Sequence, residues 1–428
     1  MYNNRTSDMR KGEHREMQVA KHETMRSVNT ATLLSCLLDN GPLTRQELQK
    51  RTGLSWGAVS NIVSELLTLN ILCESQLKSS HAGRKPSVVD INPKDNLCIG
   101  VDIHMQGIAC VITDLRGQTL VSLRRSIEGA SRQEVLERAA DAIFEAMETL
   151  KAKKESIIGI GVSIQGSIDR TNRISIYSPH QPEWSDVAVC SFLEERFDLP
   201  ALLFHDTIAM IIAERRHSAH NVRNMAFVKL DMGLGLSMVL NDQLYTGSDG
   251  NASEFGHIII DPQGPLCTCG NHGCLEAHVS GRSILEQVRK GIAKGKSSLK
   301  LPGKGFEGDL AAVAHAARQG SSFEKELFEA MGGYFGLGIS NLINFINPEL
   351  VVLGGEMAQY SDLYLDRAME VIRKNVWNTS RIQLELSTLG SNGAAVGAAM
   401  SLLRQTMNGH IPHAIGSLFR TLHTAMES

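Results

Sequence analysis

The first part of the chain shows helical stripes of apolar residues separated by short polar breaks. Between residues 25 and 38 apolar side chains recur at helical spacing, and Asn40-Gly41-Pro42 interrupts the pattern. Thr44 and Glu47 have the spacing of a capping box, which predicts a second short helix that ends at Gly53. Two helices joined by a tight break are therefore expected.

A third helix and a hairpin follow. Ser55 can cap the helix, and its apolar positions from Ala58 to Leu67 form one stripe. The stretch from Ile71 to Asn92 predicts two short strands around a polar turn that contains Gly83-Arg84-Lys85-Pro86. Three helices followed by such a wing form the winged variant of the helix-turn-helix, although the three helices alone also fit a generic helical bundle.

The exposed face of the predicted third helix favours DNA binding. A helix tip that carries only small or hydrogen-bonding side chains can enter a major groove, where Asn and Ser read base edges. Basic residues of the second helix can lie near phosphates, and an arginine at the wing tip suits a narrow minor groove. The predicted DNA-binding residues are Arg45, Ser55, Trp56, Ala58, Ser60, Asn61, Arg84 and Lys85.

Beyond residue 96 strands and helices alternate, which indicates an α/β fold. A β-meander is expected over residues 97–125, and a second hairpin opens at residues 225–240. This repetition predicts two related α/β lobes with a cleft between them. Between the two hairpins we expect helices at 131–153, 186–197 and 206–216 and strands at 157–163 and 201–204.

Three of the eight cysteines lie within eight residues. Cytosolic thiols stay reduced, so this clustering points to a metal more than to disulfides. Together with His257, residues Cys267, Cys269 and Cys274 supply one imidazole and three thiolates, the number that closes a tetrahedral structural zinc site. Two alternatives remain, namely His272 as the imidazole ligand and an oxidisable thiol cluster.

Composition and charge limit the other possibilities. With 428 residues, 42% hydrophobic and 21% charged, the chain can bury two or three cores. No apolar run approaches the roughly 20 residues that span a bilayer, and no signal-peptide core is present, so we expect a cytoplasmic protein. Residues 1–94 hold 13 Lys and Arg against 9 Asp and Glu, a bias compatible with a polyanionic partner.

The chain resembles the ROK family of bacterial repressors, open-reading-frame proteins and sugar kinases from about residue 25 to 405, and most closely its branch of glucose and N-acetylglucosamine regulators. The strongest marker is Glu254-Phe-Gly-His257 followed by Cys267-x-Cys-Gly-x-x-Gly-Cys-Leu-Glu276. Residues 43–69 and 83–86 are similar to the repressors' DNA-binding domain and wing. The resemblance implies an α/β fold class: a winged helix-turn-helix followed by a two-lobed, actin-like and sugar-kinase-like (ribonuclease H-like) body with a zinc loop.

The resemblance also implies an effector site. The five positions with which family kinases bind sugar carry carboxylates and imidazoles, which suit hydroxyls that both donate and accept hydrogen bonds. At one of these positions the chain departs from the family, because His205 stands where the family has an asparagine. The histidine of the Glu-x-Gly-His motif would hold zinc by one ring nitrogen and a sugar or sugar-phosphate by the other. These positions are His205, Asp206, Glu254, His257 and Glu276.

Both phosphate loops of the family kinases are altered. The first, Asp-x-Gly-Gly-Thr-Lys in the kinases, reads Asp102-Ile-His-Met-Gln-Gly107 here. The second, Gly-Thr-Gly-x-Gly, reads Asp231-Met-Gly-Leu-Gly235 and sets an aspartate against phosphate. We therefore expect no enzymatic activity, no catalytic residue, and a role for Asp206 in holding sugar hydroxyls.

The resulting hypothesis is a repressor of sugar uptake and metabolism genes that binds a palindromic double-stranded operator as a homodimer or homotetramer and is released by a sugar or sugar-phosphate that closes the lobes. One alternative is control by a membrane transporter subunit through the amphipathic tail, and another is an active hexose or N-acetylhexosamine kinase. The predicted segments are a flexible arm 1–24, the DNA-binding domain 25–94, lobes 95–222 and 223–405, and a C-terminal amphipathic helix 406–428.

Overall fold

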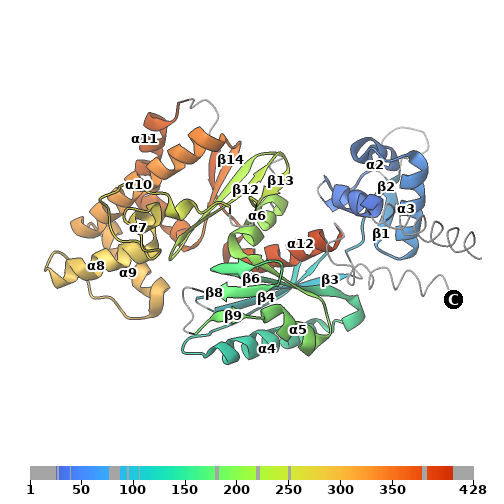
Figure 1. Ribbon diagram of the computed structural model, residues 1–428, viewed down its shortest axis with the longest axis horizontal. Coiled ribbons are helices and arrows are strands. Elements are labelled where there is room, and N and C mark those ends of the chain that lie inside the picture. The colour runs from blue at the N-terminus through green and yellow to red at the C-terminus, as the bar shows by residue number, and fades with distance from the viewer. Residues whose placement is uncertain are drawn as a thin grey trace, which may run out of the picture. The chain divides into compact units, whose positions relative to one another are not determined.

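The computed structural model describes most of the chain as two compact units (Figure 1). The first contains the chain up to Arg216 and again from Ala394, and the second runs from His217 to Gly393. No helix in the described part has both the length and the apolar character that crossing a membrane requires. The described residues are 26, 28–38, 40–76, 87–93, 96–105, 107–178, 183–217, 222–248, 252–377 and 383–407.

The first unit begins with the predicted winged helix-turn-helix. Its strands pair antiparallel, and a bridge between Leu43 and Val89 joins the second strand to the residue before the N-cap of the second helix. Buried leucine, valine and isoleucine side chains from all these elements form its core. The elements are a helix over residues 28–38, α2 (Arg45–Thr52), α3 (Trp56–Thr68), β1 (Leu72–Gln76) and β2 (Ser87–Ile91).

Local hydrogen bonds explain where these helices begin and end. Thr44 and Glu47 form the predicted capping box, since each side chain accepts from the backbone N–H of the other. Gly53 ends α2 in the left-handed region at φ 70°, and the Ser55 side chain accepts from Ala58 N at the start of α3. The caps that the sequence predicted are confirmed.

The α/β part of the first unit is built on one five-stranded sheet of order β10-β6-β3-β4-β5. The strands β3, β6 and β10 are parallel, and β4 and β5 continue from β3 as an antiparallel meander. The elements are β3 (Leu97–His104), β4 (Gly107–Asp114), β5 (Thr119–Arg125), α4 (Arg132–Leu150), β6 (Ile157–Ile164), β7 (Ser167–Asp169), β8 (Ile174–Tyr177), β9 (Ser185–Val187), α5 (Val189–Phe197), β10 (Ala201–His205) and α6 (Asp206–His217).

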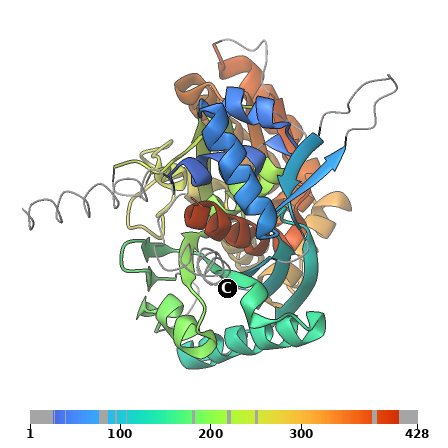
Figure 2. The ribbon, with the colours of Figure 1, turned by 90° about the vertical axis from the view of Figure 1, so that its right-hand side faces the viewer.

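The last described helix, α12 (Gly393–Met407), also packs on this sheet, on the face opposite α4 and α5 (Figures 1 and 2). Glycines in the central strands permit the contact, because a Cβ on Gly161 would lie 2.1 Å from the Ala398 carbonyl oxygen. The sequence placed residues 394–405 in the second lobe. The chain instead returns to the first unit at Ala394.

The second unit repeats the sheet of the first, with order β13-β12-β11-β14-β15. Again a three-stranded antiparallel meander is followed by two strands parallel to its first strand. The predicted pair of related α/β lobes is confirmed. The elements are β11 (Met225–Leu230), β12 (Leu234–Leu240), β13 (Gln243–Tyr245), α7 (Leu275–Val279), α8 (Gly281–Ala293), α9 (Gly305–Arg318), α10 (Ser322–Ile346), β14 (Leu350–Gly354), α11 (Leu365–Asn375) and β15 (Gln383–Leu386).

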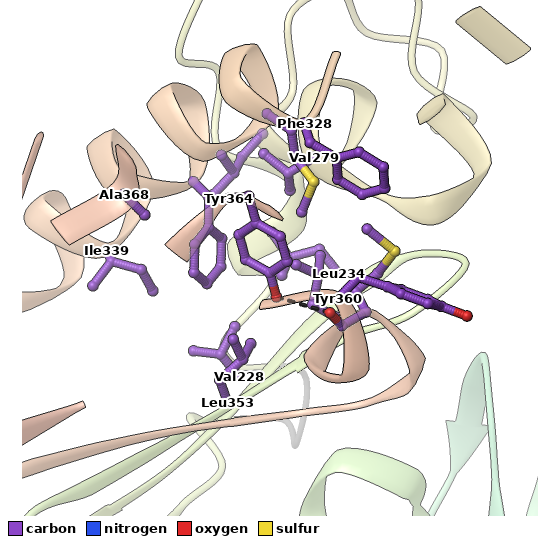
Figure 3. Packing of buried hydrophobic residues seen from close by; sticks show 14 of the residues in the cluster. Val228, Leu234, Val279, Phe328, Ile339, Leu353, Tyr360, Tyr364 and Ala368 are labelled. Atoms are coloured by element: carbon purple, nitrogen blue, oxygen red, sulfur yellow. Dashed lines mark hydrogen bonds between the residues drawn. The ribbon is translucent and has the colours of Figure 1, made fainter. Parts of the chain in front are cut away.

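Helices and strands of the second unit share one apolar core (Figure 3). Val228 and Leu353 come from the sheet, and Phe328 and Ile339 come from α10. The buried Tyr364 hydroxyl donates to the Met357 carbonyl at 3.0 Å, so the one polar atom that it brings into the core has a partner. Phe255 and Leu275, on either side of the loop that precedes α7, belong to this core, which therefore supports the loop.

Candidate functional site

The third helix of the winged domain presents an uncharged face, on which small and hydrogen-bonding side chains follow one exposed tryptophan. Trp56 is 52% exposed, Asn61 and Gly57 are exposed, and Ser60 is half-buried. The first acidic residue of α3 is Glu65, which pairs with Arg26 at 2.5 Å. No carboxylate of the first two turns of α3 would therefore oppose a phosphate backbone.

Three of the predicted DNA contacts also have structural partners. The Ser55 hydroxyl accepts the Ala58 N–H at 3.2 Å, so it acts as a helix cap. Arg45 lies 3.6 Å from Glu74 of β1 and is only 26% exposed, and its buried Nε has no acceptor among the described residues. Arg45 thus connects α2 to the wing strand. The wing residues Arg84 and Lys85 and the tail at 406–428 lie outside the described residues, apart from the end of α12.

The four predicted metal ligands come together in the second unit. The nearest ligand atoms of His257, Cys267, Cys269 and Cys274 all lie within 4.8 Å of one another. His257 Nδ1 is 3.7 Å from Cys267 Sγ, and Cys269 Sγ is 3.6 Å from Cys274 Sγ. A tetrahedral zinc ion with ordinary bond lengths would separate its ligand atoms by about 3.6–3.8 Å. This set of side chains can hold a metal ion.

Of the two candidate histidines, only His257 lies in the cluster of the described residues. His272 Nδ1 lies 3.1 Å from the Gly264 carbonyl oxygen and is not part of the cluster. Burial and hydrogen bonds with the other two thiols raise the pKa of Cys274 to about 12. A bound cation would compensate the charge of these three thiols and so favour their ionisation.

The fold brings the metal cluster next to two expected effector residues. His257 faces the cysteines with Nδ1, and the described residues give its Nε2 no partner. Cys274 immediately precedes α7, whose second residue is Glu276. Glu254 is exposed, and its carbonyl oxygen accepts from His257 N at 3.1 Å.

Glu276 holds the turn between β11 and β12. Its carboxylate accepts from Leu234 N at 2.9 Å and from the Thr268 hydroxyl at 3.3 Å. A Cβ on Gly233 would lie 2.7 Å from Glu276 Oε2, so any other residue there would displace this carboxylate. Neither contact was predicted, because the sequence separations of 42 and 8 residues carry no signal for them.

The remaining expected effector residues, His205 and Asp206, lie in the first unit, where β10 ends and α6 begins. Asp206 is buried, and its Oδ1 accepts from Thr207 N at 2.8 Å. His205 Nδ1 lies 2.9 Å from the Thr207 hydroxyl and 3.0 Å from Asp206 Oδ1. This contact orients the imidazole that replaces the family's asparagine.

In the segment 231–235, which the sequence suggested as an altered phosphate loop, two backbone N–H groups are bonded to carboxylates of the protein itself. Asp231 Oδ1 accepts from Met232 N at 2.9 Å, and Glu276 accepts from Leu234 N. In a phosphate loop such backbone N–H groups point at the nucleotide. Asp231 Oδ2 also lies 3.5 Å from Lys229 Nζ.

The same region of the second unit carries further negative charge. The pKa of Glu356 is raised by burial and also by the nearby carboxylates of Glu307 and Asp231. At the end of β3 in the first unit, Asp102 is buried and accepts from the Ser163 hydroxyl at 2.7 Å. A nucleotide polyphosphate bound near Asp231 would be repelled by the negative charge of these carboxylates.

A winged helix-turn-helix joined to two lobes with the same strand order and a Cys3His cluster defines a class of DNA-binding regulators with a sugar-kinase-like body. The winged helix-turn-helix DNA-binding family matches residues 32–71, and the ROK family matches residues 98–405. The chain belongs to the ROK family.

Relatives match almost the whole chain. The xylose repressor of Bacillus spizizenii is 27% identical over 395 residues, which cover 92% of this chain and 99% of the relative. The DNA-binding transcriptional dual regulator NagC of Escherichia coli is 25% identical over 399 residues, which cover 92% and 97%. Relatives along the full length are thus transcription regulators.

Solved structures agree with the sequence relatives. A ROK family transcriptional regulator described as a homologue of the Escherichia coli MLC protein has a TM-score of 0.76, with 25% identity and coverage of 92% of this chain and 99% of that chain. A ROK family glucokinase from Streptomyces griseus, in complex with glucose and AMPPNP, has a TM-score of 0.61 at 25% identity and covers 71% of this chain and 98% of its own. Kinases are structural neighbours of the body.

Proposed function

We propose that this chain is a sugar-responsive transcriptional repressor. The observation that carries the proposal is the combination of an uncharged, exposed recognition helix with a kinase-like body whose loop N–H groups are bonded to its own carboxylates. The names of the relatives, xylose repressor and NagC, support the same reading. An operator as partner places this function in the cytoplasm.

The DNA-binding assignment uses two elements. Trp56, Ala58, Ser60 and Asn61 on α3 contact base edges, while Ser55 fixes the start of that helix. Arg45 supports the wing through Glu74, and on the operator it exchanges this partner for a phosphate. Arg84 and Lys85 of the wing complete the proposed set.

The effector is a sugar or sugar-phosphate held by His205, Asp206, Glu254, His257 and Glu276. Buried or hydrogen-bonded carboxylates such as Asp206 and Glu276 have fixed orientations, which discriminate among hydroxyl patterns. One structural zinc ion per chain, bound by His257 and the three cysteines, would fix the ring of His257 so that Nε2 is available to the sugar. The effector binds the DNA-free conformation more tightly and so relieves repression.

Phosphoryl transfer is not part of this function. Catalysis would require donors aimed at the transferred phosphoryl group, and two candidate donors, Met232 N and Leu234 N, are already bonded to carboxylates. Asp206 then serves as a sugar ligand and not as a base. ATP-dependent phosphorylation of a hexose or N-acetylhexosamine by the purified chain would refute this part.

The repressor acts as a homodimer or homotetramer on a palindromic operator. Two aromatic side chains of the second unit support an association surface: Phe345 is 89% exposed and Trp377 is 98% exposed. Asn344, the residue before Phe345, accepts from Trp377 N at 3.0 Å, so the two segments that carry these aromatic residues are in contact. Phe345→Glu should lower the mass measured by light scattering, whereas Phe144→Glu, at a 61% exposed position on α4, should not.

An electrophoretic mobility shift assay tests the function. The unaltered chain first selects a duplex from a random-sequence pool, and its affinity for this duplex is then measured with D-xylose, D-glucose, N-acetyl-D-glucosamine and the 6-phosphates of the two hexoses. We expect one of these to weaken operator binding at least tenfold, within the usual range of allosteric coupling. Equal affinity in all mixtures would exclude a sugar effector and favour control by a transporter subunit.

A further inference from the structure

The helix that begins at the expected effector residue ends at a contact with the hairpin of the first sheet. α6 starts at Asp206, and ten residues later Arg216 Nε donates to the Arg116 carbonyl oxygen at 3.2 Å. Ten residues of α-helix span about 15 Å. One stiff element therefore connects two places that are distant in the first unit.

Packing leaves α6 little freedom to bend. Seven of its residues are buried, including Ala209, and a Cβ on Gly397 of α12 would lie 1.8 Å from the Ala209 carbonyl oxygen. The backbones of α6 and α12 are thus in direct contact. A displacement at one end of α6 is transmitted along its length, because packed helices move as rigid bodies.

The hairpin turn that receives Arg216 is itself rigid. Asp114 Oδ1 accepts from Arg116 N at 2.8 Å and from Gln118 N at 2.9 Å. Gly117 lies in the left-handed region at φ 82°, and a Cβ there would be 2.9 Å from Met400 Sδ of α12. The Arg116 side chain is therefore held on a fixed backbone.

The Arg116 guanidinium pairs with Asp90, which lies on β2 of the winged domain. The Asp90 side chain is only 10% exposed, so an unpaired carboxylate there would be strongly disfavoured. The residue before it, Val89, exchanges two backbone hydrogen bonds with Leu43 at the start of the capping box of α2. Asp90 thus connects the wing strand β2 to the hairpin. Through the bonds between Val89 and Leu43, the segment that leads into the second helix is connected as well.

We propose that α6 couples effector occupancy at Asp206 to the DNA-binding domain through Arg216, Arg116 and Asp90. The proposal rests on the proposed function, since it takes Asp206 as an effector ligand. Arg116 and Arg216 are positioning residues that contact neither sugar nor DNA. When sugar binding shifts α6, the Arg116 turn moves with it, and Asp90 carries the change to β2 and α2.

The test compares charge-neutral variants of the full-length chain. In Arg116→Gln and Arg216→Gln, the affinity of the DNA-free protein for the active sugar should stay within about threefold of the unaltered chain. The factor by which that sugar weakens operator binding should fall from at least tenfold to less than about threefold. Asp90→Asn should reproduce Arg116→Gln, and the double variant should add nothing. Arg125 lies on β5 of the same hairpin and pairs with Glu145 of α4, so Arg125→Gln is the matched control and should retain full coupling. Retention of full coupling in Arg116→Gln and Arg216→Gln would overturn the proposal.

Hydrogen exchange separates this proposal from the effector assignment. Asp206→Asn changes the start of α6 without any sugar, and should alter amide exchange of residues 87–93 in the otherwise unaltered chain but not in the Arg116→Gln background. Unchanged exchange at 87–93 in Asp206→Asn would overturn the coupling path. Failure of the proposed function gives a different result, namely no response of the operator complex to any sugar in the unaltered chain.

Discussion

Replacing Cys269 with serine tests the metal centre most directly. Serine does not ionise at neutral pH and is a poor zinc ligand, so the site would keep three of the four side chains that now lie within 4.8 Å of one another. Complete structural zinc sites are worth about 10–16 kcal/mol, so an average ligand contributes about 3 kcal/mol, or roughly 100-fold in zinc affinity. A loss of that size in a domain of this length lowers Tm by about 6–12 °C.

The effect should extend to the effector position. Leu275 N donates to the Ile258 carbonyl oxygen at 2.9 Å, and Ile260 N donates to that of Gly273 at 2.9 Å, so the backbone that carries the cysteines also sets where α7 begins. Loosening this loop displaces Glu276 on α7. We therefore expect Cys269→Ser to weaken the response of operator binding to sugar in parallel with the loss of stability.

Zinc content after dialysis against a chelator, measured by mass spectrometry, and thermal unfolding provide the assay. The unaltered chain should keep one zinc per chain and Cys269→Ser well under half. His272→Ala and Cys73→Ser are controls, because His272 bonds to Gly264 outside the cluster and Cys73 lies on β1. The reasoning is wrong if Cys269→Ser keeps its zinc and its Tm, or if His272→Ala loses them.

Three further predictions follow from single contacts. Gly161→Ala places a Cβ 2.1 Å from the Ala398 carbonyl oxygen and should lower the free energy of unfolding by about 2–3 kcal/mol in denaturant titrations, whereas Gly333→Ala, with no atom within 4 Å, should not lower it. Burial, with neighbouring carboxylates, raises the pKa of Glu356 above 4.5, so the folded chain binds this proton more tightly than the unfolded one. Stability should therefore fall as pH rises above about 4.5 through the raised pKa, and Glu356→Gln should flatten this part of the thermal unfolding profile. Asn61→Ala, at an exposed position, should weaken operator binding about 5- to 150-fold in fluorescence anisotropy without a change in Tm.

The carboxylates of the second unit suggest how a kinase-like body can serve regulation. Glu276 is bonded through Oε2 to the turn at Leu234 and through Oε1 to Thr268 near the cysteines. A sugar that binds Glu276 would therefore compete with, or reorient, bonds that hold the β11–β12 turn. In a kinase that turn would face phosphate, whereas in the proposed regulator it would respond to the bound sugar.

Local features of this protein were determined by the sequence. The capping box of Thr44 and Glu47, the Ser55 cap and the repeated meanders depend on residues close in the chain, so spacing and periodicity were sufficient to predict them. The cluster of His257 with the three cysteines was also predicted, because thiols that lie within eight residues of one another have few other structural explanations.

Only the tertiary structure decided the contacts between distant segments. It selected His257 over His272, returned α12 to the first sheet, and joined Arg216 to Arg116 across 100 residues. Such contacts depend on how the sheets bring remote turns and helix ends together, and residue spacing carries no record of that. A sequence motif thus specifies which side chains come together when they are close in the chain. For residues distant in the chain, the packing of the core decides which side chains come together.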